Sequence, residues 1–292
     1  MKKVKITEQI VLYTFFAIAC FLIVFPFWLL LSASLSDSAV LALKGYQVLP
    51  RPIDFSAYRY VFKNPTQIMR AYGITFVFSI VTMFFSVLLM SMIAYPLSRR
   101  DLKGRNGMNF FLYFTMLFGG GLVPTYILIA KYLHLNDNLL VYILPALINP
   151  WYVFMIRTFF SGVPIEIVES AKVDGASEYA IFFRMILPIS KPVLATVALF
   201  MFLGKWNDWN TALIYISKPE LYSLQYLLQK IMEDVNILKQ NQTAASMIDM
   251  ENIPTETVRM AMAVVAAGPA LIVFPFFQKY FVKGLTVGSV KG

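Results

Sequence analysis

"VESAKVDGASEYAIFFRMILP", residues 168–188, lies between two long apolar runs of the sequence. Five of its side chains are charged (Glu169, Lys172, Asp174, Glu178 and Arg184). It cannot cross a bilayer, because each charge buried in lipid costs several kcal/mol. Its apolar residues are nevertheless too many for a solvated connector, and a short helix gains its stability from packing. This stretch therefore predicts a surface element that buries one face.

Local signals predict two helices around a glycine turn. Pro164 suits a first helical turn, where its missing N–H costs nothing. Gly175 follows Asp174 and suits a C-terminal cap that requires positive φ. Ser177 is typical of the cap of a second helix, and we expect Pro188 to end that helix. The segment is thus predicted to be helix, glycine turn, helix.

Two interpretations of its apolar face are open. An amphipathic helix of this kind can lie on the lipid surface. It can also dock in a groove of a partner protein. Glu169 and Asp174 disfavour contact with an anionic leaflet, which slightly favours the protein partner.

Composition places the chain in a membrane. Hydrophobic residues make up 59% of its 292 residues and charged residues only 14%, well below soluble domains. The net charge of +9 comes from basic residues that flank apolar runs, where they anchor helix ends at headgroups, so we expect no nucleic-acid partner. With one cysteine, Cys20, and one histidine, His134, we expect no disulfide framework and no metal site.

The predicted fold class is an all-α integral membrane protein that forms one transmembrane domain, residues 1–292. Runs of sufficient length and low charge predict six transmembrane helices. The first resembles a signal peptide but is too long for one, so we expect it to be retained. The spans are expected at about residues 11–33, 71–97, 107–130, 139–160, 192–215 and 259–280.

Charge distribution predicts the orientation. Basic residues gather at the N-terminus, in the turn at 98–106, in the connector at 157–191 and near the C-terminus. Short basic segments of this kind stay in the cytoplasm. The first loop, with five basic residues, argues the other way but is longer. Both termini and residues 168–188 are therefore expected on the cytoplasmic side of the cell membrane.

Proline and glycine interrupt several of the apolar runs, most densely in "GGGLVP", residues 119–124. Broken helices are tolerated in lipid only where protein or a water-filled cavity satisfies the freed backbone groups. Ordinary kinks between packed helices would explain these residues. Alternatively, the break at 119–124 borders a translocation pathway.

The fifth run contains a polar cluster, "KWNDWNT" at 205–211, in the outer half of the predicted span. Polar groups at that depth indicate function by default. Tryptophan faces and amides suit a sugar, but an interfacial aromatic belt with a self-satisfied Lys205–Asp208 pair explains the same residues. Candidate pathway residues are Trp206, Asn207, Asp208, Trp209 and Asn210, with Tyr126 and Trp151 as weaker candidates. The polar loop at 216–257 is expected outside the cell, as a solvated connector or a docking site.

The spacing within 168–188 resembles the EAA loop of ABC-importer permease subunits. That pattern is Glu-Ala-Ala, three residues, Gly, nine residues, Ile, one residue, Leu-Pro. Here it falls on Glu169, Ala171, Gly175 and Leu187-Pro188, with Ser170 and Met185 as the departures. "GGGLVPTY", "WNDWNTALIY" and the C-terminal "KGLTVGSVKG" extend the likeness over the chain and resemble the MalG type, which imports maltose and other oligosaccharides.

This resemblance implies a type I ABC-importer permease fold and a function as a membrane subunit of an ATP-driven oligosaccharide importer. The loop at about 162–190 would be the coupling helix seated in an ATPase subunit, and the C-terminal tail would reach the ATPase dimer interface. Implied partners are an ATPase dimer, a second permease, an extracytoplasmic solute-binding protein, the oligosaccharide and the lipid bilayer. The implied coupling residues are Glu169, Ser170, Ala171, Asp174, Gly175, Leu187 and Pro188, and the implied tail residues are Gly284, Gly288 and Gly292.

Two other functional classes compete with this one. An ion-coupled secondary transporter would use Asp208, although such a protein is expected to carry carboxylates in several spans. An intramembrane enzyme would need a nucleophile–base pair, and none stands out in the sequence. The sequence also has no G-x-x-x-x-G-K-[ST] phosphate loop, so ATP and Mg²⁺ are expected on a partner and no cofactor on this chain.

Overall fold

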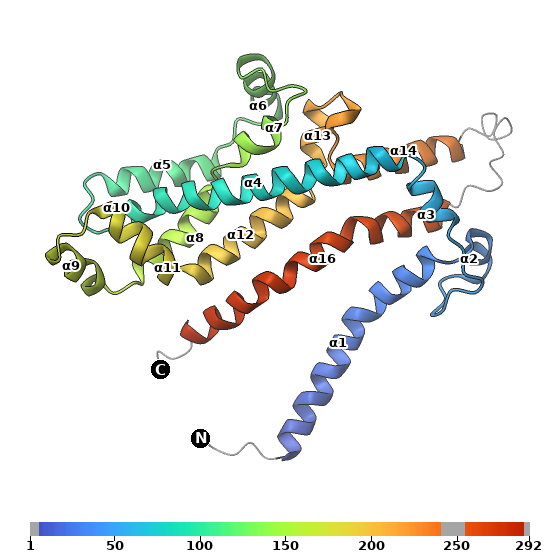
Figure 1. The fold of residues 1–292 in the computed structure, drawn as a ribbon, viewed down its shortest axis with the longest axis horizontal. Helices are drawn as coiled ribbons and strands as arrows, with labels where there is room; N and C mark the ends of the chain where they lie inside the picture. Colours follow the sequence, from blue (N-terminus) through green and yellow to red (C-terminus); the bar gives the residue numbers. More distant parts are fainter. Residues whose placement is uncertain (1–5, 241–254, 289–292) are drawn as a thin grey trace. The chain divides into compact units, whose positions relative to one another are not determined.

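A computed structural model of the chain describes the backbone of residues 6–240 and 255–288 and the side chains of residues 7–237 and 256–278. All named secondary-structure elements of the described part are helices, and turns, loops and an isolated bridge between Ser36 and Ile53 connect them (Figure 1). The chain forms two compact units. One unit comprises residues 1–66 and 228–268, and the other comprises residues 67–227 and 269–292.

In the first unit, helix α1 (Ile6–Ser34) is followed by two short helices, α2 (Ser38–Lys44) and α3 (Ser56–Val61). The connecting loop is held to the end of α1 by side-chain hydrogen bonds. Trp28 Nε1 donates to the carbonyl of Val48 at 2.8 Å, and Ser32 Oγ donates to the carbonyl of Gln47 at 2.7 Å. The first predicted loop is therefore an ordered element with its own short helices.

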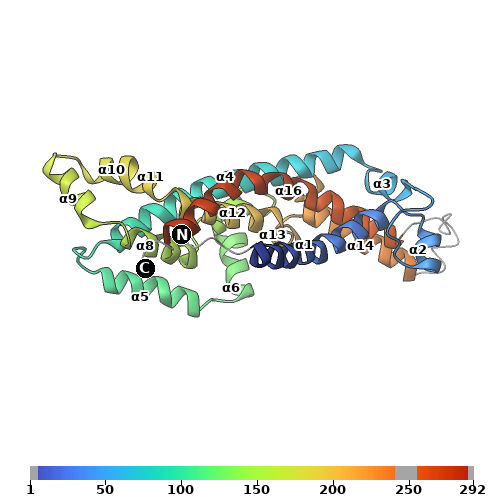
Figure 2. The ribbon, with the colours of Figure 1, turned by 90° about the horizontal axis from the view of Figure 1, so that it is seen from below.

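The second unit is built around α4 (Pro65–Ser98), α5 (Arg105–Leu117), α8 (Pro150–Ser161) and α12 (Lys191–Trp206), which Figures 1 and 2 show in two views. Shorter elements connect them. These are α6 (Leu122–Ile127), η1 (Leu128–Tyr132), α7 (Leu140–Ile143), η2 (Leu144–Ala146), α9 (Ile165–Val173), α10 (Glu178–Ile181), η3 (Phe182–Ile186), α11 (Leu187–Ile189), α13 (Asn210–Tyr215) and η4 (Pro219–Leu221).

One face of α4 forms the centre of this unit. Its middle turns bury small polar residues (Thr75, Ser79, Thr82 and Ser86), which allow neighbouring helices to approach closely. Its C-terminal turns bury Met90, Ala94 and Leu97 in a hydrophobic cluster with residues of α8 and α12.

Among the described residues, three helical stretches are long and apolar enough to cross a membrane by themselves: Thr7–Ser34, Pro65–Ser98 and Glu256–Gln278. They coincide with the first, second and sixth predicted spans. Three further crossings are possible if each of three bent helix pairs counts as one span. The pairs bend by 108° between α5 and α6, by 49° between α7–η2 and α8, and by 79° where Glu178–Ile189 meets α12.

The predicted break at 119–124 is therefore a sharp bend and not a gentle kink. Gly121 has φ of +82°, which only glycine adopts without strain, at the start of α6. By contrast, Pro26, Pro269 and Pro275 all lie inside uninterrupted helices. The three helix-interior prolines thus fit ordinary kinks, whereas a position of the 119–124 break beside a translocation pathway stays a prediction.

The fifth predicted span, 192–215, is wrong as one continuous helix. Helix α12 ends at Trp206, and α13 begins at Asn210. At the interruption, the Asp208 side chain accepts a hydrogen bond from the backbone N–H of Thr211 at 3.0 Å. A short carboxylate of this kind stabilises a new helix start in place of the continuing helix.

The predicted polar loop at 216–257 is also wrong over its first part. Residues Leu224–Gln240 form helix α14, with Leu224, Leu227, Leu228 and Val235 buried at helical spacing. Because most of the other residues in the segment are polar, the helical spacing of these four apolar residues is hard to recognise in the sequence. Residues 241–254 lie outside the described part.

Helix α16 (Thr255–Gly288) contains the sixth predicted span and continues through the first part of the predicted tail. Gly284 and Gly288 lie in its last turns, so these two positions are helical and do not form a separate extension. Gly292 lies outside the described residues.

Candidate functional site

The structure confirms that residues 164–190 form two helical segments around a glycine turn. Helix α9 ends in a Schellman motif, in which the N–H of Gly175 bonds to the Lys172 carbonyl at 3.0 Å and the N–H of Ala176 bonds to the Ala171 carbonyl at 2.9 Å. Gly175 has φ of +77°. A Cβ added there would meet no atom within 4 Å, so backbone conformation and not crowding requires glycine.

The second segment begins and ends close to the predicted positions. Ser177 caps α10 as expected, its Oγ accepting from the N–H of Ala180 at 3.3 Å. The helix ends at Ile189, one residue after Pro188, but its preceding turn widens into the π-helix η3, which the sequence does not predict. Local π adjustments of this kind accommodate the backbone groups that a proline leaves unbonded.

The two helical segments have one buried face and one exposed face. Val168, Ala171, Ile181, Phe182 and Ile186 belong to the hydrophobic cluster that α4, α8 and α12 share. This part of the apolar surface therefore serves the chain itself, and Ala171 acts as a small packing residue. The expectation that the whole apolar face awaits another protein is thus corrected.

The opposite face of α9 is open. Val173 is 88% exposed, and Glu169 and Asp174 are also exposed. Glu169 forms no ion pair with any side chain that the structure describes. An exposed valine next to unpaired carboxylates is an amphipathic surface that a second protein could cover.

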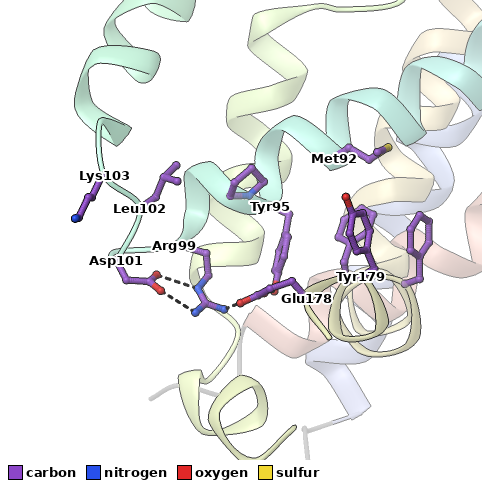
Figure 3. A pocket seen from close by; sticks show the side chains of 11 residues that line it. Met92, Tyr95, Arg99, Asp101, Leu102, Lys103, Glu178 and Tyr179 are labelled. Atoms are coloured by element: carbon purple, nitrogen blue, oxygen red, sulfur yellow. Dashed lines mark hydrogen bonds and ion pairs between the residues drawn. The ribbon is translucent and has the colours of Figure 1, made fainter. Parts of the chain in front are cut away.

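Charged residues connect this element to the end of α4. The Glu178 carboxylate lies 2.6 Å from Lys172 Nζ. It also accepts a hydrogen bond from the Tyr95 hydroxyl at 2.8 Å, and Figure 3 shows these two side chains next to each other. Arg99 makes a two-fold hydrogen bond to Asp101, with distances of 3.2 and 3.1 Å. These bonds from Arg99 hold the pKa of the Asp101 carboxyl below its usual value, so the pair stays ionised at neutral pH.

A cavity of about 460 Å³ lies beside this network. One wall comes from α4 and the turn after it, and the other from α10 and η3 (Figure 3). Its floor is largely apolar and its rim carries Arg99, Asp101, Lys103 and Glu178. The contact between α4 and the segment at 164–190 is therefore incomplete at this end, and polar bonds bridge it.

The candidate pathway residues are brought together only in part. Trp206 is 1% exposed, packed against Phe202 and Tyr72, so its ring contributes to helix packing in this structure. Asn207, Trp209 and Asn210 are exposed around the helix break. Tyr126 stacks on Tyr215 with 5.7 Å between ring centroids. Trp151 lies in the first turn of α8, with its ring exposed.

The Asp208 carboxylate forms an ion pair and hydrogen bonds with residues close to it in the sequence. One carboxylate oxygen lies 2.7 Å from Lys205 Nζ and accepts from the Thr211 hydroxyl at 2.8 Å. Both members of the Lys205–Asp208 pair are largely buried, with side-chain exposures of 14% and 13%. The Lys205–Asp208 ion pair that one of the two interpretations of this cluster predicts is therefore present.

One feature of the same unit escaped the sequence-based predictions. Asp137, with φ of +52°, accepts hydrogen bonds from the backbone N–H groups of Ser217 and Lys218 at 2.6 and 3.0 Å. The hydrogen bond from the Lys218 N–H has the larger effect and the bond from the Ser217 N–H the smaller one, and both lower the pKa of the Asp137 carboxyl. The partners are about 80 residues apart, so no local spacing reveals the contact. The Tyr95–Glu178 bond was missed for the same reason.

Comparison with known proteins identifies the class. The family of inner membrane components of binding-protein-dependent transport systems matches residues 9–287. The chain belongs to this family. It is a membrane-embedded permease subunit of the ABC-importer class, and it resides in the cell membrane.

Individual relatives cover nearly the whole chain. Protein LplC of Bacillus subtilis is 40% identical over 271 residues, which cover 92% of this chain and 90% of LplC. The polygalacturonan/rhamnogalacturonan transport system permease protein YtcP of the same organism is 36% identical and covers 97% of this chain and 98% of YtcP. A chain from the crystal structure of a bacterial ABC transporter involved in the import of the acidic polysaccharide alginate superposes with a TM-score of 0.76 at 28% identity, covering 96% of this chain and 100% of that one.

Proposed function

We propose that the chain imports an oligosaccharide that carries acidic sugar units, as one permease subunit of an ATP-driven transporter. Two findings support the acidic class. YtcP is named for polygalacturonan and rhamnogalacturonan, and the matched solved transporter is named for alginate. A further relative, AraQ of Bacillus subtilis, is 30% identical and named for arabinooligosaccharides, which supports the wider oligosaccharide class. The ion-coupled alternative gains no support, since Asp208 is bonded to Lys205.

The proposed membrane arrangement is a single domain of six spans with both termini in the cytoplasm. Three long helices, the two bent pairs that start at Arg105 and Leu140, and α12 with α13 would supply the six crossings, which leaves Glu178–Ile189 to the cytoplasmic coupling site. Basic residues in the short segments at 98–106 and 157–191 favour the cytoplasmic side for residues 162–190. A second, similar permease would complete the pathway.

The coupling site is the exposed face of α9, which docks on an ATPase subunit. The observation that carries this proposal is the two-sided helix. Its buried face, with Ala171, is fixed to the core, while Glu169, Ser170 and Asp174 stay exposed. Glu169 would pair with a cation of the ATPase, and Gly175 would set the turn that orients the helix. Leu187 and Pro188 would carry the movement into α12.

ATP and Mg²⁺ would be held by an ATPase dimer. Cycles of ATP binding would move the α9 face, and an extracytoplasmic binding protein would deliver the sugar. Following the family resemblance, the region of Gly284, Gly288 and Gly292 would approach the ATPase dimer interface. Asn207, Trp209 and Asn210, exposed at the break in the fifth span, would contact the sugar, with Asp208 holding the break in place.

Reconstitution tests this function. The chain is purified with its second permease, its ATPase and its binding protein, and uptake of labelled oligogalacturonate into proteoliposomes is measured. We expect uptake that requires both ATP and the binding protein, and that neutral oligosaccharides compete poorly. Uptake by the chain alone without ATP would contradict the importer, whereas uptake of neutral sugars only would contradict the acidic class.

A further inference from the structure

Glu178 bonds the proposed coupling element, residues 164–190, to α4. It is the first residue of α10, just beyond the glycine turn. One of its carboxylate oxygens lies 2.6 Å from Lys172 Nζ, on α9. The other accepts the Tyr95 hydroxyl hydrogen at 2.8 Å and lies 3.9 Å from Arg99 Nη1 (Figure 3). A single carboxylate thus joins α9, α10 and the end of α4.

The C-terminal end of α4, which Glu178 contacts, is also bonded to α5 and α8. The carbonyl oxygen of Leu97 accepts hydrogen bonds from Arg105 Nε, at the start of α5, and from Arg157 Nε, on α8, each at 3.0 Å. Carbonyls at a helix C-terminus have no partner within the helix, and arginine side chains satisfy them well. A displacement of the last turn of α4 would therefore reach two further helices.

Apart from these bonds of Glu178, to Tyr95 and to Arg99 just after α4, no directional bond between the coupling element and α4 is found in the described part of the chain. The Tyr95 ring also lies 5.3 Å from that of Phe182, but apolar contacts of this type permit sliding. The cavity of about 460 Å³ beside them leaves the two elements without close packing on that side. The chain itself joins α9 backward to α8 and forward through α10, η3 and α11 to α12, but it provides no direct link to α4.

We infer that Glu178 is the positioning residue through which movement of the coupling loop reaches α4, by its hydrogen bond with Tyr95. The inference rests on the proposed function, because it assumes that an ATPase moves α9. Without this bond, ATP-driven movement passes along the chain to α8 and α12, and it reaches α4 only indirectly, through the Arg157–Leu97 bond of α8 or through apolar contact.

Glu178 and Lys172 are exposed enough for the role of Glu178 in coupling to be tested without loss of folding stability. Glu178 and Lys172 have side-chain exposures of 53% and 41%, and ion pairs this exposed contribute little to folding. Variants at Glu178 should therefore fold and assemble. Their defect should appear in the coupling between ATP hydrolysis and transport.

The test uses the complete transporter in proteoliposomes and measures sugar imported per ATP hydrolysed. Glu178→Ala and Tyr95→Phe should each lower this ratio about five-fold, the low end of typical coupling effects, with the amount of assembled complex unchanged. The double variant should be no worse than either single variant, because both remove the same bond. Glu178→Gln should stay near the unaltered ratio, since its amide oxygen still accepts from Tyr95. Glu166→Gln, an exposed carboxylate in the first turn of α9, is the matched control.

Several outcomes would overturn the inference. Unchanged ratios in Glu178→Ala and Tyr95→Phe would show that α4 moves without the bond. Additive defects in the double variant would mean that the two residues act separately. If Glu178→Gln were as defective as Glu178→Ala while Tyr95→Phe was normal, the pair with Lys172 inside the loop would be responsible. A transporter without ATP-dependent import even before substitution would instead contradict the proposed function itself.

Discussion

The coupling element and the break in the fifth span both interrupt helices next to charged residues, yet they use those charges differently. At the break, Lys205, Asp208 and Thr211 satisfy one another within seven residues of chain. At the coupling element, Glu178 is bonded to Tyr95, 83 residues away, and Glu169 is left open. Charged groups bonded to near neighbours in the sequence stabilise a kink in the helix. A charged group bonded to a distant helix, such as Glu178, or exposed without an ion pair, such as Glu169, is available to transmit a movement or to bind a partner.

The largest expected effect tests the locally satisfied site. Asp208→Ala leaves Lys205 largely buried without its anion, and breaking a buried pair typically costs about 3–5 kcal/mol. We expect a clearly lower melting temperature of the purified chain in detergent. The double variant Lys205→Met/Asp208→Leu removes both charges and should recover most of the loss. A melting temperature unchanged in Asp208→Ala would contradict the structural role of the pair.

The next effect concerns the open site. Glu169→Lys reverses a charge on the exposed face of α9, where we propose that an ATPase cation binds. Loss of an interfacial charge pair of about 2 kcal/mol corresponds to roughly 30-fold weaker coupling. Substrate-stimulated ATP hydrolysis should therefore largely disappear while the chain stays in the membrane. Glu166→Lys, one turn earlier, is the control, and equal effects of the two would remove the special role of Glu169.

A smaller effect is expected from the turn between the two helices. Gly175→Ala places a side chain at φ of +77°, at a cost of about 1–2 kcal/mol. Import should fall about five- to thirty-fold, because the strain favours a different turn and misplaces α9. Gly162→Ala is the matched control, since Gly162 has φ of −88°. Equal import by both alanine variants would show that the turn conformation is unimportant.

The smallest effect separates structure from substrate contact within the fifth span. Trp209 is exposed beside the break, and removing a stacking ring typically costs about 1 kcal/mol. Trp209→Ala should raise the sugar concentration for half-maximal uptake about five-fold, with little change in melting temperature. Leu213→Ala removes an exposed apolar side chain from α13 and serves as control. If uptake kinetics stay intact in Trp209→Ala, the residue belongs to an interfacial belt.

Much of the coupling element was predictable because its determinants are local. Gly175 predicts a backbone position with positive φ, and Ser177 predicts the start of a helix; the structure has both. The π-helix before Pro188 was not predictable, because the widened turn depends on how Phe182 and Ile186 are packed in the core. The sequence likewise gave no sign of whether Ala171 faces inward or outward.

The sequence by itself determined the membrane class, the positions of the three uninterrupted apolar helices and the glycine turn, because these depend on length, charge and backbone freedom of neighbouring residues. Tertiary structure alone decided which face of α9 is buried, that Trp206 packs inside, and that Glu178 meets Tyr95 and Asp137 meets Ser217. These contacts join residues that are distant along the chain. Their geometry depends on how whole helices pack, which no local pattern contains.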